Sequence, residues 1–193
     1  MRKIILIIIL LSASLFGNFI GMNNGARALA MGNAFVALSD ETTAIFYNPA
    51  GLARINQFNI ALSRENLHGL SDLYSDMVAI SFPTPFFRTG IAVQQINLVE
   101  TYSEQILYLS AAGIINPKNI PIRLGVSLKH ESAKVKSYEN AKTPTNFDLD
   151  LGVLIDFTEN IFFGYSIKYL LEPEFQFISE GDKLEQKHSV GLF

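Results

Sequence analysis

The chain has 193 residues, a formal net charge of −3 and no cysteine. The length suits one domain, the charge provides no basic field for nucleic acid, and the lack of cysteine excludes disulfides, thiolate metal sites and a cysteine-linked lipid anchor. Hydrophobic residues make up 49% of the chain and charged residues 17%, against about 25% charged in a usual soluble domain.

Residues 1–17 have the pattern of a secretory signal peptide. Arg2 and Lys3 supply the positive charge, Ile4 to Leu11 is apolar, and small residues up to Gly17 offer cleavage sites. The apolar run is shorter than the ~18–20 residues of a spanning helix. Only helices and closed β-barrels satisfy their backbone groups inside a bilayer. We therefore expect an exported protein of the bacterial outer membrane.

Residues 18–55 are predicted to form a separate N-terminal segment. It is rich in Gly and Ala and shows almost no strand-like alternation. Asp40 is expected to cap a helical turn that runs through Thr43. Asn48 is expected to cap a second turn that begins at Pro49, because proline at the first helical position loses no needed hydrogen bond. The segment fits a compact plug of short helices and turns.

Residues 56–193 are predicted to form about eight antiparallel strands, because apolar and polar residues alternate with a period of two. The approximate positions are 58–63, 78–82, 91–94, 106–115, 122–129, 147–156, 161–169 and 187–193. Segment 106–115 is also compatible with a buried helix, but its place among strands favours a strand. A soluble sandwich shows similar alternation. The signal peptide and the mean hydropathy of +0.24 favour a barrel with its apolar face in lipid.

Six charged residues share the polar face of these strands and are predicted to face the barrel lumen. They are Arg123, Lys129, Asp148, Asp150, Asp156 and Lys168. One interpretation is a charged lumen that selects or orients cargo. The other, which we favour, is a set of ion pairs that keeps the barrel in shape, because structural ion-pair networks are common. No histidine stands at ligand spacing from these aspartates, so no metal site is predicted.

Several aromatic residues near the predicted strand ends are candidates for interfacial girdles. They are Tyr102, Tyr108, Phe157, Phe162 and Tyr169. For any one of them, an ordinary strand aromatic is an equally good interpretation. The GxSxG, HExxH and Walker-type motifs are absent, and no histidine stands in a recognisable nucleophile setting. We therefore expect neither an enzyme nor a cofactor.

The segment GARALAMGNAFVALSDETTAIFYNPAGLA, Gly25 to Ala53, closely resembles the N-terminal signature of the FadL/PorV superfamily of outer-membrane barrels. In that signature a Gly/Ala-rich stretch precedes an acidic turn, here Asp40 and Glu41, and then Asn-Pro-Ala-Gly. The strands at 125–130 and 148–154 also resemble strands of the PorV/PorQ-like branch.

The resemblance implies a barrel of about fourteen strands with the N-terminal segment folded inside as a hatch. The hatch residues that it implies are Gly25, Gly32, Asp40, Asn48, Pro49, Ala50 and Gly51. Members of the FadL type pass hydrophobic solutes such as long-chain fatty acids, and members of the PorV type bind exported proteins in a secretion system. Passage of hydrophobic solutes is therefore the leading prediction, and binding of exported proteins is the alternative.

A third possibility is a soluble periplasmic β-sandwich used as a scaffold. For a barrel, the expected partners are outer-membrane lipid, the barrel-assembly machinery, and either hydrophobic molecules or exported proteins, with no nucleic acid.

The chain is short for the family. An eight-stranded barrel is filled by its own side chains and has no room for a plug. We therefore favour the interpretation that the chain is the N-terminal part of a larger barrel. The alternatives are that a second chain completes the barrel, or that the hatch lies outside it. Phe193 as an aromatic end residue would suit a short barrel.

Overall fold

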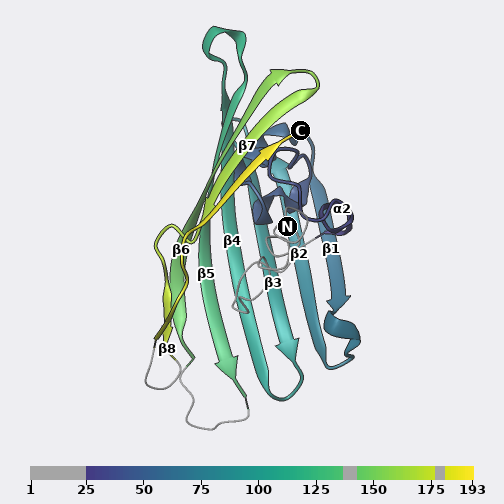
Figure 1. Cartoon of the computed structure of the whole chain (residues 1–193), viewed down its shortest axis with the longest axis vertical. Coiled ribbons are helices and arrows are strands. Elements are labelled where there is room, and N and C mark those ends of the chain that lie inside the picture. Colours follow the sequence, from purple (N-terminus) through teal and green to yellow (C-terminus); the bar gives the residue numbers. More distant parts are fainter. Residues whose placement is uncertain (1–24, 137–142, 177–180) are drawn as a thin grey trace, which may run out of the picture.

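The computed structural model describes residues 25–136, 143–176 and 181–193, so the predicted signal peptide lies outside the described residues. Eight strands form one antiparallel sheet in chain order, with β10 beside β7 (Figure 1). The strands are β1 (Asn59–Asn66), β2 (Leu73–Pro83), β3 (Arg88–Leu98), β4 (Tyr102–Ile115), β5 (Ile122–Val135), β6 (Thr145–Thr158), β7 (Ile161–Lys168) and β10 (Lys187–Leu192). The sheet is open, with β1 and β10 at its edges.

The remaining described elements are short. The helix α2 and the 3-10 helices η1 and η2 belong to the N-terminal segment, and they span Ala26–Ala30, Thr42–Phe46 and Pro49–Arg54. The connections contain η3 (Leu67–Gly69) and η4 (Pro117–Asn119), and β8 (Glu174–Gln176) pairs with β9 (Gly181–Lys183) in a small second sheet.

The prediction of an all-β, antiparallel fold is confirmed, and the segment 106–115 is indeed a strand. Strands β2 and β3 are longer than predicted, because pairing continues through polar positions where the apolar alternation stops. Asp76 and Gln95, for example, are still Cα partners. The β8–β9 pair was not predicted, since three residues are too few to show a period.

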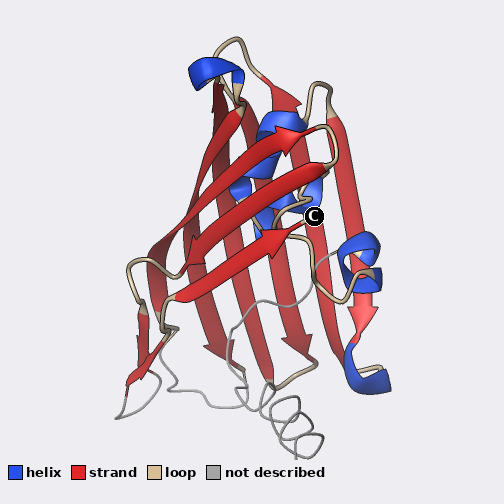
Figure 2. Ribbon diagram, turned by 45° about the horizontal axis from the view of Figure 1, so that its top comes forward, coloured by secondary structure: helices blue, strands red, loops and turns tan. Residues whose placement is uncertain are grey.

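One face of the sheet is covered by residues 25–55, and we call it the covered face (Figures 1 and 2). The residues on this face change from apolar to charged across the sheet. Paired neighbours run from Ala79 and Ala92 on β2 and β3 through Tyr108 to Lys129 and Asp148 on β5 and β6. The apolar half packs against Phe46, Leu52 and other buried residues of the segment, which together form the main hydrophobic core.

The opposite face, which we call the open face, carries large apolar side chains that nothing in the described residues covers. In β5, Leu124, Val126 and Leu128 are exposed, whereas Ser127 and Lys129, which point to the covered face, are buried. The same pattern holds from β1 to β10, with the exposed residues Ile60, Leu62, Val78, Ile91, Leu107, Leu109, Phe147, Leu151, Ile161, Val190 and Leu192. The sheet thus buries its charged residues on the covered face, beside a core of apolar residues, and exposes large apolar residues on the open face.

A row of polar residues borders the apolar part of the open face. Successive Cα partners along this row, from β1 to β6, are Arg64, Asp76, Gln95, Gln105, Ser132 and Thr145. The next outward-facing row is formed by Leu62, Val78, Val93, Leu107, His130 and Phe147. The open face therefore has an apolar band with a polar border on the side of the β1–β2 and β3–β4 turns.

Candidate functional site

The turn formed by Asn48, Pro49, Ala50 and Gly51 anchors the N-terminal segment to the sheet. Asn48 is fully buried, and its Oδ1 accepts a hydrogen bond from the backbone amide of Ala50 at 3.2 Å. Its Nδ2 donates to the backbone oxygens of Val36 and of Val153 on β6, each at 3.0 Å. The predicted cap at Asn48 is confirmed, and the same side chain also joins the segment to the sheet.

Two paired glycines on the covered face leave the space for this turn. Gly125 on β5 and Gly152 on β6 are Cα partners. A Cβ on Gly125 would lie 2.2 Å from the amide nitrogen of Ala50, and a Cβ on Gly152 would lie 2.0 Å from Asn48 Oδ1. Both separations are far below contact distance. Glycine inside a strand pattern often marks close backbone approach, and this signal was available in the sequence.

The predicted cap at Asp40 is wrong. The helix η1 begins after Glu41 and has no side-chain cap. Asp40 instead accepts two hydrogen bonds from Arg27 of α2, at 2.6 and 3.2 Å. A bidentate pair with a guanidinium is a stronger interaction than a bond to a neutral amide, which explains the difference.

The two glycines predicted for the N-terminal segment have different surroundings. Gly25 has a φ of 91°, and a Cβ there would lie 2.8 Å from Thr43 Cγ2. Gly32 has a φ of 61° with no other atom within 4 Å of an added Cβ. Gly32 therefore serves the backbone conformation alone, whereas Gly25 serves both the conformation and a close contact.

Asp156 links the N-terminal segment to two strands. Its Oδ1 lies 2.8 Å from Arg54 Nη2 at the end of η2, and its Oδ2 pairs with Arg123 of β5. The Arg54 guanidinium also stacks 4.7 Å from the ring centroid of Phe162. Arg123 and Asp156 were predicted from their position on the polar face. Arg54 was not, because a single arginine outside any periodic pattern gives no signal.

Lys129 is surrounded by carboxylates at the centre of the covered face. Its Nζ lies 2.6 Å from Asp148, 2.8 Å from Asp150 and 3.4 Å from Glu131, and its side chain is 2% exposed. The Nζ also lies 3.9 Å from the ring centroid of Tyr169. This arrangement fits the ion-pair interpretation of the charged face. Glu131 was missed, although its position two residues after Lys129 places it on the same face.

The same aspartates hold the turn after β7. Asp150 Oδ1 accepts from the amide of Tyr169 at 3.2 Å, and Asp148 Oδ1 accepts from the amide of Leu171 at 3.0 Å. Lys168, the last of the six predicted charged residues, donates to the backbone oxygen of Phe46. It therefore holds η1 against the sheet.

The small β8–β9 sheet follows this turn. Tyr169, Phe175 and Leu184 form a second buried apolar cluster there. An exposed hydrogen bond and ion pair with Glu172 raise the pKa of Lys183.

The girdle interpretation is wrong for Tyr108, Phe162 and Tyr169, which do not face outward. Tyr108 is 8% exposed and packs edge-on against Phe46 at 5.0 Å, and Tyr169 is 4% exposed beside Lys129. Tyr108 has the parity of the covered face, and Tyr169 lies just past the end of β7. Phe162 is half-buried under Arg54, whereas Phe157 is exposed on the open face.

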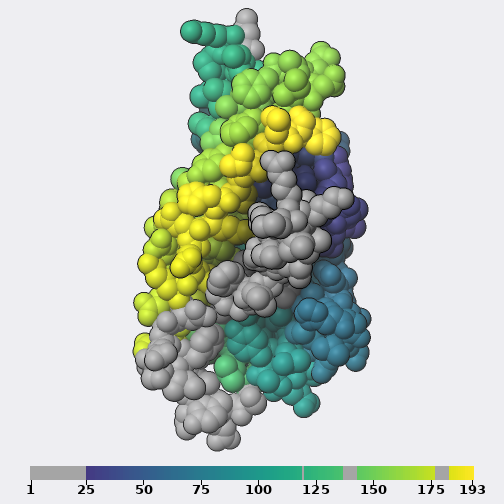
Figure 3. Space-filling view, viewed as in Figure 1, coloured from purple at the N-terminus to yellow at the C-terminus, as the bar shows by residue number. Residues whose placement is uncertain are grey.

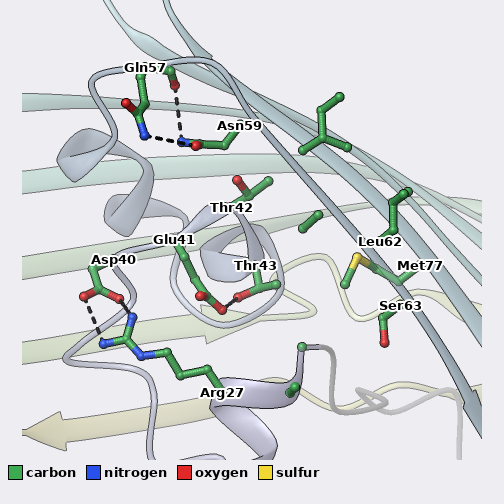
Figure 4. A pocket seen from close by; sticks show the side chains of 14 residues that line it. Arg27, Asp40, Glu41, Thr42, Thr43, Gln57, Asn59, Leu62, Ser63 and Met77 are labelled. Carbon is green, nitrogen blue, oxygen red and sulfur yellow. Dashed lines mark hydrogen bonds and ion pairs between the residues drawn. The ribbon is translucent and has the colours of Figure 1, made fainter.

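A cleft of about 670 Å³ lies between the N-terminal segment and the edge strand β1 (Figure 4). Figure 4 shows the Arg27–Asp40 pair and Thr43 on one side, and the β1 residues Asn59 and Ser63 on the other. Ala61, Leu62 and Met77 add apolar surface. The cleft is therefore lined by charged, polar and apolar side chains.

Comparisons with protein-family models, with curated proteins and with solved structures find no match to this chain. No helix in the described residues is long and apolar enough to cross a membrane. Within the same residues, no group of histidine, aspartate and glutamate side chains is arranged to hold a metal ion.

Proposed function

We propose that the chain is an exported outer-membrane β-barrel protein of the FadL/PorV kind, with residues 25–55 as its hatch. The observation that carries this proposal is the inverted burial of the sheet. Lys129, Asp148 and Asp150 are buried on the covered face, whereas Leu62, Leu109 and Val190 are more than half exposed on the open face. Lipid is the environment in which such an outward apolar face is stable.

The size of the apolar band supports the same proposal. Along β6, outward residues from Phe147 to Phe157 are apolar, which corresponds to about 33 Å of strand at ~3.3 Å per residue. A strand tilted by about 40° then crosses roughly 25 Å, the usual height of the apolar band of an outer-membrane barrel. The polar row from Arg64 to Thr145 fits the position of one membrane boundary.

A soluble β-sandwich is less consistent with these features. A sandwich needs a second layer over each large apolar face, and here the N-terminal segment covers one face of the sheet while the open face, with Leu124, Val126 and Leu128, stays exposed. Contiguous exposed apolar surface of this extent is rare on soluble monomers.

For the cargo, we propose hydrophobic solutes such as long-chain fatty acids, on the strength of the N-terminal resemblance. Three side chains fix the N-terminal segment to the sheet: Asn48, Arg54 and Lys168. A solute that passes through the cleft beside β1 would therefore require the least rearrangement of the segment. The same fixation favours the second candidate, a barrel that binds exported proteins, because such a lumen need not conduct.

Binding of a long-chain fatty acid to the detergent-purified protein tests the solute proposal. We expect saturable binding by the wild-type protein. Ala61→Phe, which adds a ring to the cleft wall, is expected to weaken it about tenfold, since overpacking costs about 1–3 kcal/mol. Ala111→Phe on the open face of β4 is the matched control and is expected to bind normally. A wild-type protein without saturable binding would exclude this cargo and leave exported proteins as the candidate.

A further inference from the structure

The turn between β2 and β3 holds two phenylalanines in exposed positions. Phe86 is 84% exposed and Phe87 is 56% exposed. Thr84 closes the turn, because its backbone amide and its hydroxyl donate to the backbone oxygen of Phe87 at 2.8 and 2.7 Å, and the amide of Phe87 donates to Thr84 Oγ1 at 3.0 Å. Pro83 and Pro85 have no N–H, so the turn leaves few backbone donors that need water. The exposure of the two rings is therefore built into the turn.

The β2–β3 hairpin ends before the neighbouring strands do. The last outward row that includes the hairpin consists of Phe82, Thr89, Ala111, Val126 and Leu151. Strands β4 to β6 continue for two further outward rows, which are Gly113, Leu124 and Val153, and then Ile115, Ile122 and Ile155. Two rows correspond to about 13 Å of strand at ~3.3 Å per residue. The two phenylalanines thus extend the apolar band at the place where the hairpin itself is short.

The β4–β5 and β6–β7 turns lie at the same end of the sheet as the β2–β3 turn, because all neighbouring strands are antiparallel. Figure 3 shows the β4–β5 turn in teal and the β6–β7 turn in light green at this end of the molecule. Ile120, Phe157 and Ile161 are exposed in or beside these two turns. The apolar surface therefore continues from the strands into the turns at this end, whereas at the opposite end it stops at the polar row.

We propose that Phe86 and Phe87 insert at the boundary between the acyl chains and the headgroups of the phospholipid leaflet at this end of the sheet. This inference rests on the proposed membrane location of the open face. Surfaces that combine phenylalanine with polar and cationic groups bind at that depth, and here Thr84 and Arg88 flank the two rings. Lipid is favoured over a protein partner because the outward rows of β2 and β3 lead directly into the turn.

Depth-dependent fluorescence quenching tests this inference, because the chain contains no tryptophan. Phe86→Trp is reconstituted in phosphatidylcholine vesicles whose acyl chains carry bromine either close to the headgroup or close to the methyl end. At position 86 we expect the bromine close to the headgroup to remove more of the emission. Val126→Trp, in the middle of the apolar band, is expected to show the opposite order.

Leu70→Trp is the matched control, since Leu70 is also exposed but follows η3 in the β1–β2 turn, beyond the polar row. It is expected to lose little emission to either bromine and to be quenched by aqueous iodide. If bromine quenches position 126 while position 86 behaves like position 70, or resists both bromine and iodide because protein covers it, the inference is wrong and the barrel stands. Stronger quenching of position 86 from the methyl end would also overturn the inference. If bromine quenches neither position 126 nor position 86, the membrane location itself is contradicted.

Discussion

Gly152→Ala is expected to lower the free energy of unfolding by about 2–3 kcal/mol and to loosen the N-terminal segment. The added Cβ would lie 2.0 Å from Asn48 Oδ1 and 2.9 Å from Pro49 Cδ. Both atoms belong to a buried turn that cannot move without losing the hydrogen bonds of Asn48, and overpacking of this kind costs about 1–3 kcal/mol. Urea unfolding in detergent measures the change, and tryptic cleavage after Arg54 reports release of the segment.

Gly113→Ala is the matched control for this variant. Gly113 lies on β4 of the same sheet, and an added Cβ there meets no atom within 4 Å. The free energy of unfolding of Gly113→Ala is expected to stay within about 0.5 kcal/mol of that of the wild type. Equal stability of the two variants, with Arg54 protected in both, would mean that the turn does not dock on Gly152.

Lys129→Met is expected to cost about 3–5 kcal/mol, because it leaves Asp148, Asp150 and Glu131 buried without their shared cation. Methionine preserves most of the side-chain volume, so the effect is one of charge rather than of packing. The turn after β7, which the two aspartates hold, is expected to loosen first. Urea unfolding and proteolysis near Leu171 measure the two effects.

Arg64→Met is the comparison for Lys129→Met. Arg64 pairs with Asp76 at 2.5 Å, but its side chain is 65% exposed. Solvent screens an exposed ion pair, so this variant is expected to be nearly as stable as wild type. If Lys129→Met were equally mild but changed the binding of cargo, the charged cluster would be a selectivity element, and our ion-pair interpretation would be wrong.

The strands and their faces could be predicted from the sequence because alternation is a local property. The spacing of Leu124, Val126 and Leu128 predicts an apolar strand face even when the neighbouring strands are not known. Asn48 was equally accessible, since Asn before Pro is a local cap signal. Its second role, donation to Val153, depends on residues that lie 105 positions apart, and no local pattern contains it.

The errors at Asp40, Tyr108 and Tyr169 share one physical cause. Each residue was interpreted from its own neighbourhood, but its partner comes from elsewhere. Asp40 pairs with Arg27 rather than with the next amides, and Tyr108 packs on Phe46. Arg54 was missed for the same reason, whereas Glu131 could have been found from its position two residues after Lys129. The polar row on the open face is also non-local, since it appears only when the register of several strands is known.

The most direct test of the account asks whether the open face meets lipid. The chain contains no tryptophan, so Val126→Trp introduces a single fluorophore in the apolar band and Ser132→Trp introduces one in the polar row of the same strand. Each variant is reconstituted in vesicles with ordinary or brominated acyl chains. We expect strong quenching by the brominated lipid at position 126 and weak quenching at 132. An emission at position 126 that is the same in both lipids would contradict a barrel with this face in the membrane.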